Sequence, residues 1–166
     1  MLGGLARWLR AAGYDALYEY GIDDGVLVAR AREEGLVLLS SDAGIFERVL
    51  VRDGAVRALF VPRAVGTAAE LGFVLKAFSL PLRDPRCMTC GGELACVPKE
   101  TVRDEAPPRT FERVEVFYRC GRCGKLLWYG THWQRIARVL DRAVNSNAPP
   151  DSVRADALDH RRKDKP

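Results

Sequence analysis

The sequence predicts an α/β fold in which a parallel sheet with flanking helices is followed by a small zinc-ribbon domain. Residues 1–82 alternate between segments of helical periodicity and short apolar runs typical of buried strands. That order favours a parallel sheet with helices on its faces. Two C-x-x-C pairs then follow, among prolines and glycines that end the alternation.

The first half begins with a predicted amphipathic helix. Apolar side chains recur at helical spacing over residues 2–12, and Gly13 is a suitable end for that helix. A short strand is expected over residues 15–20. Asp23 or Asp24 is then a suitable N-cap for a second helix, because a carboxylate accepts from the free N–H groups and suits the positive end of the helix dipole.

A continuous apolar run over residues 36–40 and a largely apolar segment over residues 56–61 predict buried parallel strands. The segment AGIFERVLV between them, residues 43–51, predicts one short helix. Thr67 and Glu70 form a T-x-x-E capping box, which predicts the start of a further helix.

The second half reads as a ribbon of strands around two cysteine loops. Its strands are expected on either side of a proline-rich loop over residues 98–110. A final helix is expected from Thr131, with an apolar face formed by Trp133, Ile136, Leu140 and Ala143.

The expected organisation has three parts. A sheet domain covers residues 1–82, and a zinc ribbon with its C-terminal helix covers residues 83–145. Residues 146–166 are poor in large apolar groups and predict a disordered tail.

Four of the five cysteines form two pairs in the pattern C-x2-C-x29-C-x2-C. In a reducing compartment such paired thiols are more typical of metal binding than of disulfides. Four thiolates complete a tetrahedral shell around Zn²⁺, which makes the site structural rather than catalytic. The predicted ligands are Cys87, Cys90, Cys120 and Cys123. Cys96 lies outside the pattern and is expected to be a buried strand residue.

Carboxylates lie near the predicted ends of the strands. Asp42 directly follows the run over residues 36–40, and ligands of open parallel sheets bind at the carboxyl ends of strands. Asp23 and Asp24 begin the preceding helix and can reach the same edge. Carboxylate oxygens suit Mg²⁺ or Mn²⁺, and such a metal activates water for attack on a phosphodiester. Helix capping by Asp23 or Asp24 and a turn at Asp42 are the alternative, which composition alone favours.

The charge distribution fits a nucleic-acid partner without requiring one. The net charge is +4 and the pI is about 8.9. The residues predicted to contact RNA are Arg7, Arg10, Arg122, Lys125 and His132. A solvated helix face is an equal alternative for the first two, and closure of the ribbon against the first domain is the alternative for His132. Aromatic residues that could stack on bases or pack in the core are Trp8, Trp128, Tyr129 and Trp133.

No apolar run is long enough for a transmembrane helix, and no segment reads as a secretory signal. We therefore expect a cytoplasmic protein with no membrane partner.

Several motifs together resemble one family. They are MLGGLARWLRAAGYD, the Asp23-Asp24 pair, LVLLSSD, the two C-x-x-C pairs and LLWYGTHW, in that order. This set resembles the Mut-seven C-terminal RNase family, a PIN-like nuclease domain joined to a zinc ribbon. The resemblance implies a metal-dependent ribonuclease in which Asp42 and Asp24, with Asp23 as neighbour, hold Mg²⁺ or Mn²⁺. Asp15, in the Gly-Tyr-Asp motif, is a weaker candidate.

The chain differs from that family pattern in two places. Family members usually begin with a strand ending in Asp, which is not present before Met1, so an N-terminally truncated PIN-like domain is expected. Ser40-Ser41 replaces Thr-Arg before Asp42, which removes a fixed positive charge. Two functions stay open: a ribonuclease that hydrolyses RNA phosphodiester bonds, and a weakened or inactive RNA- or ribosome-associated binding module.

Overall fold

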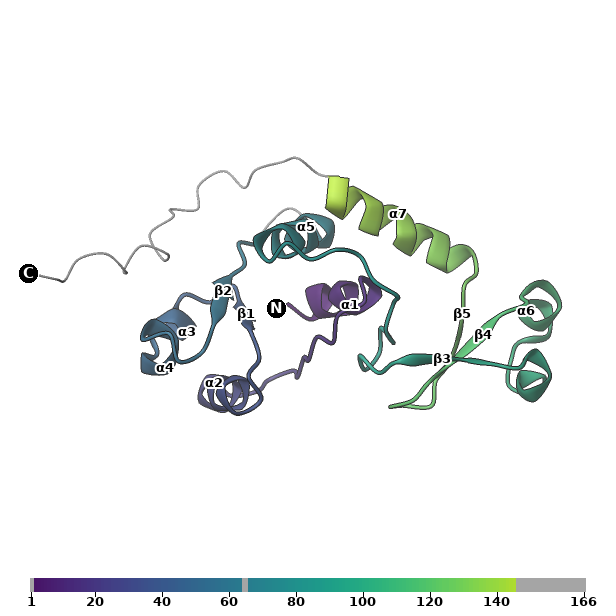
Figure 1. The fold of residues 1–166 in the computed structure, drawn as a ribbon, viewed down its shortest axis with the longest axis horizontal. Coiled ribbons are helices and arrows are strands. Elements are labelled where there is room, and N and C mark those ends of the chain that lie inside the picture. Colours follow the sequence, from purple (N-terminus) through teal and green to yellow (C-terminus); the bar gives the residue numbers. More distant parts are fainter. Residues whose placement is uncertain (1, 64–65, 146–166) are drawn as a thin grey trace, which may run out of the picture.

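Helices and short strands alternate in the first half of the chain, and the second half contains a small antiparallel sheet followed by a long helix (Figure 1). The structure, a computed structural model, describes residues 2–63 and 66–145, so the tail expected over 146–166 lies outside them. The helices are α1 (Gly3–Ala11), α2 (Asp24–Glu33), α3 (Gly44–Glu47), α4 (Val49–Arg52), α5 (Thr67–Ala77), the 3-10 helix η1 (Lys99–Val102), α6 (Pro108–Arg113) and α7 (Thr131–Asn145). The strands are β1 (Leu38–Ser40), β2 (Ala58–Phe60), β3 (Leu94–Val97), β4 (Phe117–Cys120) and β5 (Leu126–Trp128).

A two-stranded parallel sheet forms from β1 and β2, as the two apolar runs predicted. Leu38 pairs with Ala58, and Ser40 pairs with Phe60. The strands are shorter than the runs that predicted them. A small apolar core packs around the sheet, and its buried members are Val28, Ala31, Leu38, Ile45 and Val56. The mixed α/β class with a small parallel sheet is therefore confirmed.

The main core joins helices from both ends of the chain. Figure 1 shows α5 and α7 side by side above α1, and the apolar faces of the three helices pack together. The predicted face of α7 supplies the buried residues Ile136, Leu140 and Ala143. Although α7 was expected to belong with the ribbon, its packing groups it with α1 and α5.

The ribbon is a three-stranded antiparallel sheet in the order β3-β4-β5. Its own small core contains Val102, Ala106 and Phe117. The prediction of a loop over residues 98–110 is wrong, because this segment contains η1 and the start of α6. Pro108 occupies the first turn of α6, where a missing N–H costs nothing.

Three further expectations are corrected. No described residue between 15 and 20 is in a strand. The expected helix over residues 43–51 divides into α3 and α4, because Arg48 between them has extended backbone angles (φ −66°, ψ 134°). The T-x-x-E capping box does not form: Gly66 precedes α5, and Thr67 is already its first helical residue.

Among residues 2–63 and 66–145, the structure contains no helix that is long and apolar enough to cross a membrane.

Candidate functional site

The four predicted zinc ligands meet at one end of the ribbon sheet. The Sγ atoms of Cys87, Cys90, Cys120 and Cys123 all lie within 4.8 Å of one another. Cys87 Sγ lies 3.8 Å from Cys123 Sγ, and Cys90 Sγ lies 3.4 Å from Cys120 Sγ. A tetrahedron with Zn–S bonds of about 2.3 Å has S–S edges of about 3.8 Å, so these spacings fit Zn²⁺. The four cysteines can therefore hold a metal such as zinc.

The two cysteine loops have the same backbone hydrogen bonds. Gly91 N donates to Cys87 O at 2.7 Å, and Gly124 N donates to Cys120 O at 2.9 Å. In both loops the glycine has a positive φ, 82° at Gly91 and 71° at Gly124, which side chains resist. This repetition explains why a C-x-x-C-Gly sequence directs both sulfurs of each pair to one point.

Backbone N–H groups favour the thiolate form of one sulfur, that of Cys120. Burial raises the pKa of the Cys120 thiol, but the N–H groups of Cys123 and Arg122, together with the sulfurs of Cys90 and Cys123, outweigh burial and lower this pKa. Burial raises the pKa of the neighbouring Cys90 thiol. The sulfur of Cys120 therefore loses its proton more easily than that of Cys90, and a bound cation would favour the thiolate form of both. Cys96, expected to be buried, is instead exposed on β3.

Arg10 links α1 to the first cysteine loop. Only 7% of the residue is exposed, and its Nη1 donates to Met88 O at 3.2 Å and to Thr89 O at 2.9 Å. Its Nε donates to Ala16 O at 2.7 Å. The expected RNA contact at Arg10 is therefore replaced by a structural role.

Asp15 links the segment after α1 to both cysteine loops. Arg122 Nη2 donates to Asp15 Oδ2 at 2.8 Å, and Arg86 Nη2 lies 3.6 Å from the same oxygen. Arg122 also donates to Cys90 O at 2.6 Å. The hydrogen bond from Arg122 is the main cause that lowers the pKa of Asp15. Arg122 is thus half of an ion pair rather than an isolated cation.

The remaining basic candidates have different surroundings. Lys125 is exposed, and its Nζ lies 3.3 Å from Thr89 Oγ1 of the first cysteine loop. Arg7 is exposed on α1, and His132 is exposed in the first turn of α7. These three can meet a ligand in solution.

The candidate catalytic acids begin helices or turns. Asp23 caps α2, and its Oδ1 accepts from Gly25 N at 2.7 Å and from Val26 N at 3.2 Å. Asp42 follows β1, and its Oδ1 accepts from Gly44 N at 2.9 Å. Both local roles are those of the capping and turn alternative, and neither occupies both oxygens of its carboxylate.

Asp24 has a cationic partner that sequence reasoning missed. Arg48 Nη2 lies 3.6 Å from Asp24 Oδ2. Arg48 lies between α3 and α4, where its backbone is extended. Within the described residues, the four cysteines are the one group of three or more His, Cys, Asp or Glu side chains close enough to share a metal. Asp23, Asp24 and Asp42 are suitable donors for Mg²⁺ or Mn²⁺, but they do not form such a group.

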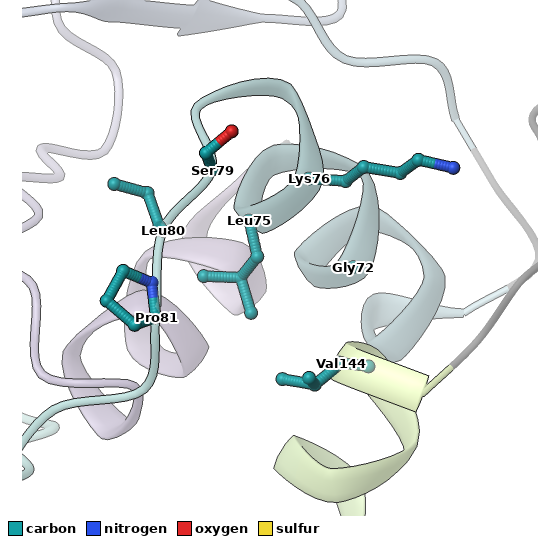
Figure 2. A pocket seen from close by; sticks show the side chains of 8 residues that line it. Gly72, Leu75, Lys76, Ser79, Leu80, Pro81 and Val144 are labelled. Carbon is teal, nitrogen blue, oxygen red and sulfur yellow. The ribbon is translucent and has the colours of Figure 1, made fainter.

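A separate hollow lies between the C-terminal parts of α5 and α7. Figure 2 shows Leu75, Leu80, Pro81 and Val144 around it, with the side chain of Lys76 extending away at its rim. The lining is mainly apolar, and Lys76 is its one ionisable side chain. Nothing in this lining resembles the acids or the cysteines of the predicted sites.

One of the comparisons with known proteins finds a match, and it covers most of the chain. The family model described as Mut7-C RNAse domain matches residues 1–140, which include β1, β2, all four zinc-ligand cysteines and most of α7. Comparison with curated proteins and with solved structures finds no match in either.

Proposed function

The chain belongs to the Mut7-C RNAse domain family, and from that premise we propose that it is a metal-dependent ribonuclease of the PIN-like type. Family membership points to a nuclease-like role and to RNA as the partner. The match over residues 1–140 is the observation that carries the proposal. The zinc ribbon is a structural part that helps to bind RNA.

Asp42 is the residue we propose first for the reaction. It directly follows β1, whose partner β2 runs parallel, and ligands of parallel sheets bind at this end of the strands. Gly44 N holds one of its oxygens, which fixes the carboxylate and leaves the other oxygen available. A divalent cation held there would supply an activated water and neutralise phosphate charge.

Asp24 and Asp23 are the proposed supporting acids at the N-terminus of α2. Asp24 is paired with Arg48 at 3.6 Å, and this long, half-exposed pair is easily exchanged for another cation. Asp23 has a free carboxylate oxygen besides the one that caps α2. Since the three acids do not meet at one point, we derive no individual reaction step through the cation.

The test is cleavage of labelled single-stranded RNA with Mn²⁺ by the parent chain, Asp42→Asn and Asp53→Asn. Asp53 is an exposed aspartate at the end of α4 and serves as the matched control. We expect cleavage by the parent and the control, a loss of about 100-fold or more in Asp42→Asn, and no cleavage in EDTA. Excess Mn²⁺ added after EDTA should restore cleavage by the parent chain. Equal rates in parent and Asp42→Asn would refute the assignment.

A second candidate function is RNA binding without cleavage. The observation that favours it is the local role of each acid: Asp23 caps α2, Asp24 pairs with Arg48, and Asp42 closes a turn. The same experiment separates the two functions. Salt-sensitive RNA binding by a parent chain that leaves the RNA intact in Mn²⁺ would establish the binding module.

A further inference from the structure

Three aromatic rings form a continuous series from the ribbon sheet to the start of α7. The ring centroids of Tyr118 and Tyr129 lie 4.8 Å apart, and those of Tyr129 and Trp133 lie 4.7 Å apart. Tyr118 belongs to β4, Tyr129 directly follows β5, and Trp133 lies in the first turn of α7. We call these three residues the aromatic series.

Tyr118 and Tyr129 of the aromatic series lie on the more open face of the ribbon sheet, whereas Trp133 also packs against the main core of helices. On the other face, Phe117 and Trp128 pack with α6 and η1 in the ribbon core. Because neighbouring strand residues point to opposite faces, Tyr118 and Tyr129 lie on the face away from that core. Tyr129 is 40% exposed, and Cys96, which pairs with Tyr118, is exposed as well. Solvent therefore reaches this face despite its aromatic character.

Positive charge lies beyond both ends of the aromatic series. Lys125 is exposed beside the cysteine cluster, with its Nζ 3.3 Å from Thr89 Oγ1 of the first cysteine loop. On α7, Arg135, Arg138 and Arg142 are exposed at spacings of three and four residues, which places them on one side of the helix. None of these three arginines forms an ion pair with a described residue.

We propose that the aromatic series and the arginine side of α7 together bind single-stranded RNA, by stacking of unpaired bases on the rings and contact of phosphates with the arginines. Every base offers a face for stacking, so this contact tolerates any sequence. The unpaired arginines favour a polyanion. They span eight residues of helix, or seven rises of about 1.5 Å, and this length of about 10 Å is enough to contact more than one phosphate. This inference rests on the proposed function for its choice of RNA, but it concerns binding and not cleavage.

The test measures binding of a labelled single-stranded RNA to the zinc-loaded full chain by fluorescence anisotropy, without added Mg²⁺ or Mn²⁺. We expect Tyr129→Ala to weaken binding about tenfold and Tyr129→Phe to keep it, since only the first removes the ring. Tyr20→Ala is the matched control, because Tyr20 is 76% exposed and lies outside the aromatic series. Circular dichroism and zinc content establish that each variant is folded.

The arginines are tested by the salt dependence of the same binding. We expect Arg138→Gln to lower the slope of log K against log salt by about 0.7, the value for one phosphate contact of a single strand. Arg109→Gln removes the same charge from α6, which packs on the opposite face of the ribbon sheet, and should leave the slope unchanged. A duplex of the same sequence should bind more weakly, because its bases are already stacked.

Three outcomes would contradict the proposed RNA-binding surface. They are an unchanged affinity in Tyr129→Ala, equal binding of duplex and single strand, and a self-associating chain that Tyr129→Ala converts to monomers. Cleavage in Mn²⁺ is measured separately. If the parent binds RNA as expected but does not cleave it, only the proposed ribonuclease activity is contradicted. If Tyr129→Ala keeps both cleavage and RNA affinity, only the proposed binding surface is contradicted.

Discussion

Gly91 and Gly124 occupy equivalent places in the two cysteine loops, but only at Gly91 would an added side chain meet another part of the molecule. Both have positive φ. A Cβ at Gly91 would collide with Asp15 Oδ1, whereas a Cβ at Gly124 would meet nothing within 4 Å. A substitution at Gly124 therefore tests backbone strain alone, whereas the same substitution at Gly91 adds a steric clash.

We expect Gly124→Ala to cost about 1–2 kcal/mol of unfolding free energy, the cost of a side chain in the left-handed region. Gly91→Ala should cost more, because the methyl group also displaces Asp15 from Arg122. Urea unfolding of the two variants measures the difference. Equal losses would mean that the contact between Gly91 and Asp15 carries no energy.

Asp15 makes the link between the two halves dependent on pH. Arg122 lowers the pKa of Asp15 below its usual 3.8, so the ion pair adds stability above that value and loses it as the pH falls through the lowered pKa. We expect Asp15→Asn to lose about 1 kcal/mol or less at pH 7, because the pair is half-exposed. The difference between the two proteins should shrink below about pH 4. A difference that is constant from pH 7 to pH 3 would contradict this account.

At the scale of single elements, Asp23 tests whether the start of α2 is a cap or a ligand site. Asp23→Ala removes the acceptor for Gly25 N and Val26 N and should cost about 1 kcal/mol. Asp23→Ser keeps an acceptor and should retain most of this stability. Thermal unfolding reports the cap, and RNA cleavage reports the ligand. Full stability with lost cleavage in Asp23→Ser would assign the residue to catalysis as well.

Elements set by local pattern could be predicted, and those set by distant contacts could not. The apolar period of residues 2–12 is sufficient to define α1, and a C-x-x-C-Gly sequence contains its own loop geometry. The break at Arg48 has no local signal, because neither a proline nor a glycine occurs over residues 45–52. Prolines in the segment before α6 suggested a loop, although a proline in the first turn is compatible with a helix.

The residues of the candidate site, too, were predictable only where a local pattern determines their role. The cysteines were predictable because four thiols have one obvious common use. The burial of Arg10 was not, because its acceptors Met88 and Thr89 lie 78 and 79 residues away in the chain. The acids are suitable residue types at suitable positions, yet their distances depend on how α2 packs beside β1, which no local pattern encodes.

For the molecule as a whole, metal binding at the cysteine cluster should stabilise residues outside the ribbon as well as the ribbon itself. Arg10 and Asp15 attach the segment after α1 to the loops that bear the cysteines. We expect Cys87→Ser to lower zinc content and to speed hydrogen exchange at residues 10–16 as well as at the loops. Cys96→Ser is the matched control, since Cys96 is exposed and outside the cluster. Exchange at residues 10–16 that is unaffected by zinc loss would show that the halves are independent.

The packing of α7 on α1 and α5 has a consequence for how the protein is made. A ribosome releases α1 and α5 first, with the apolar side chains of Leu71 and Val74 still lacking the cover that Ile136 and Leu140 provide in the finished core. The ribbon emerges next and can take up its metal while that surface is still open. The first part of the chain to be synthesised is thus among the last to be completed, and a nascent chain stalled before Thr131 would be a natural client for chaperones.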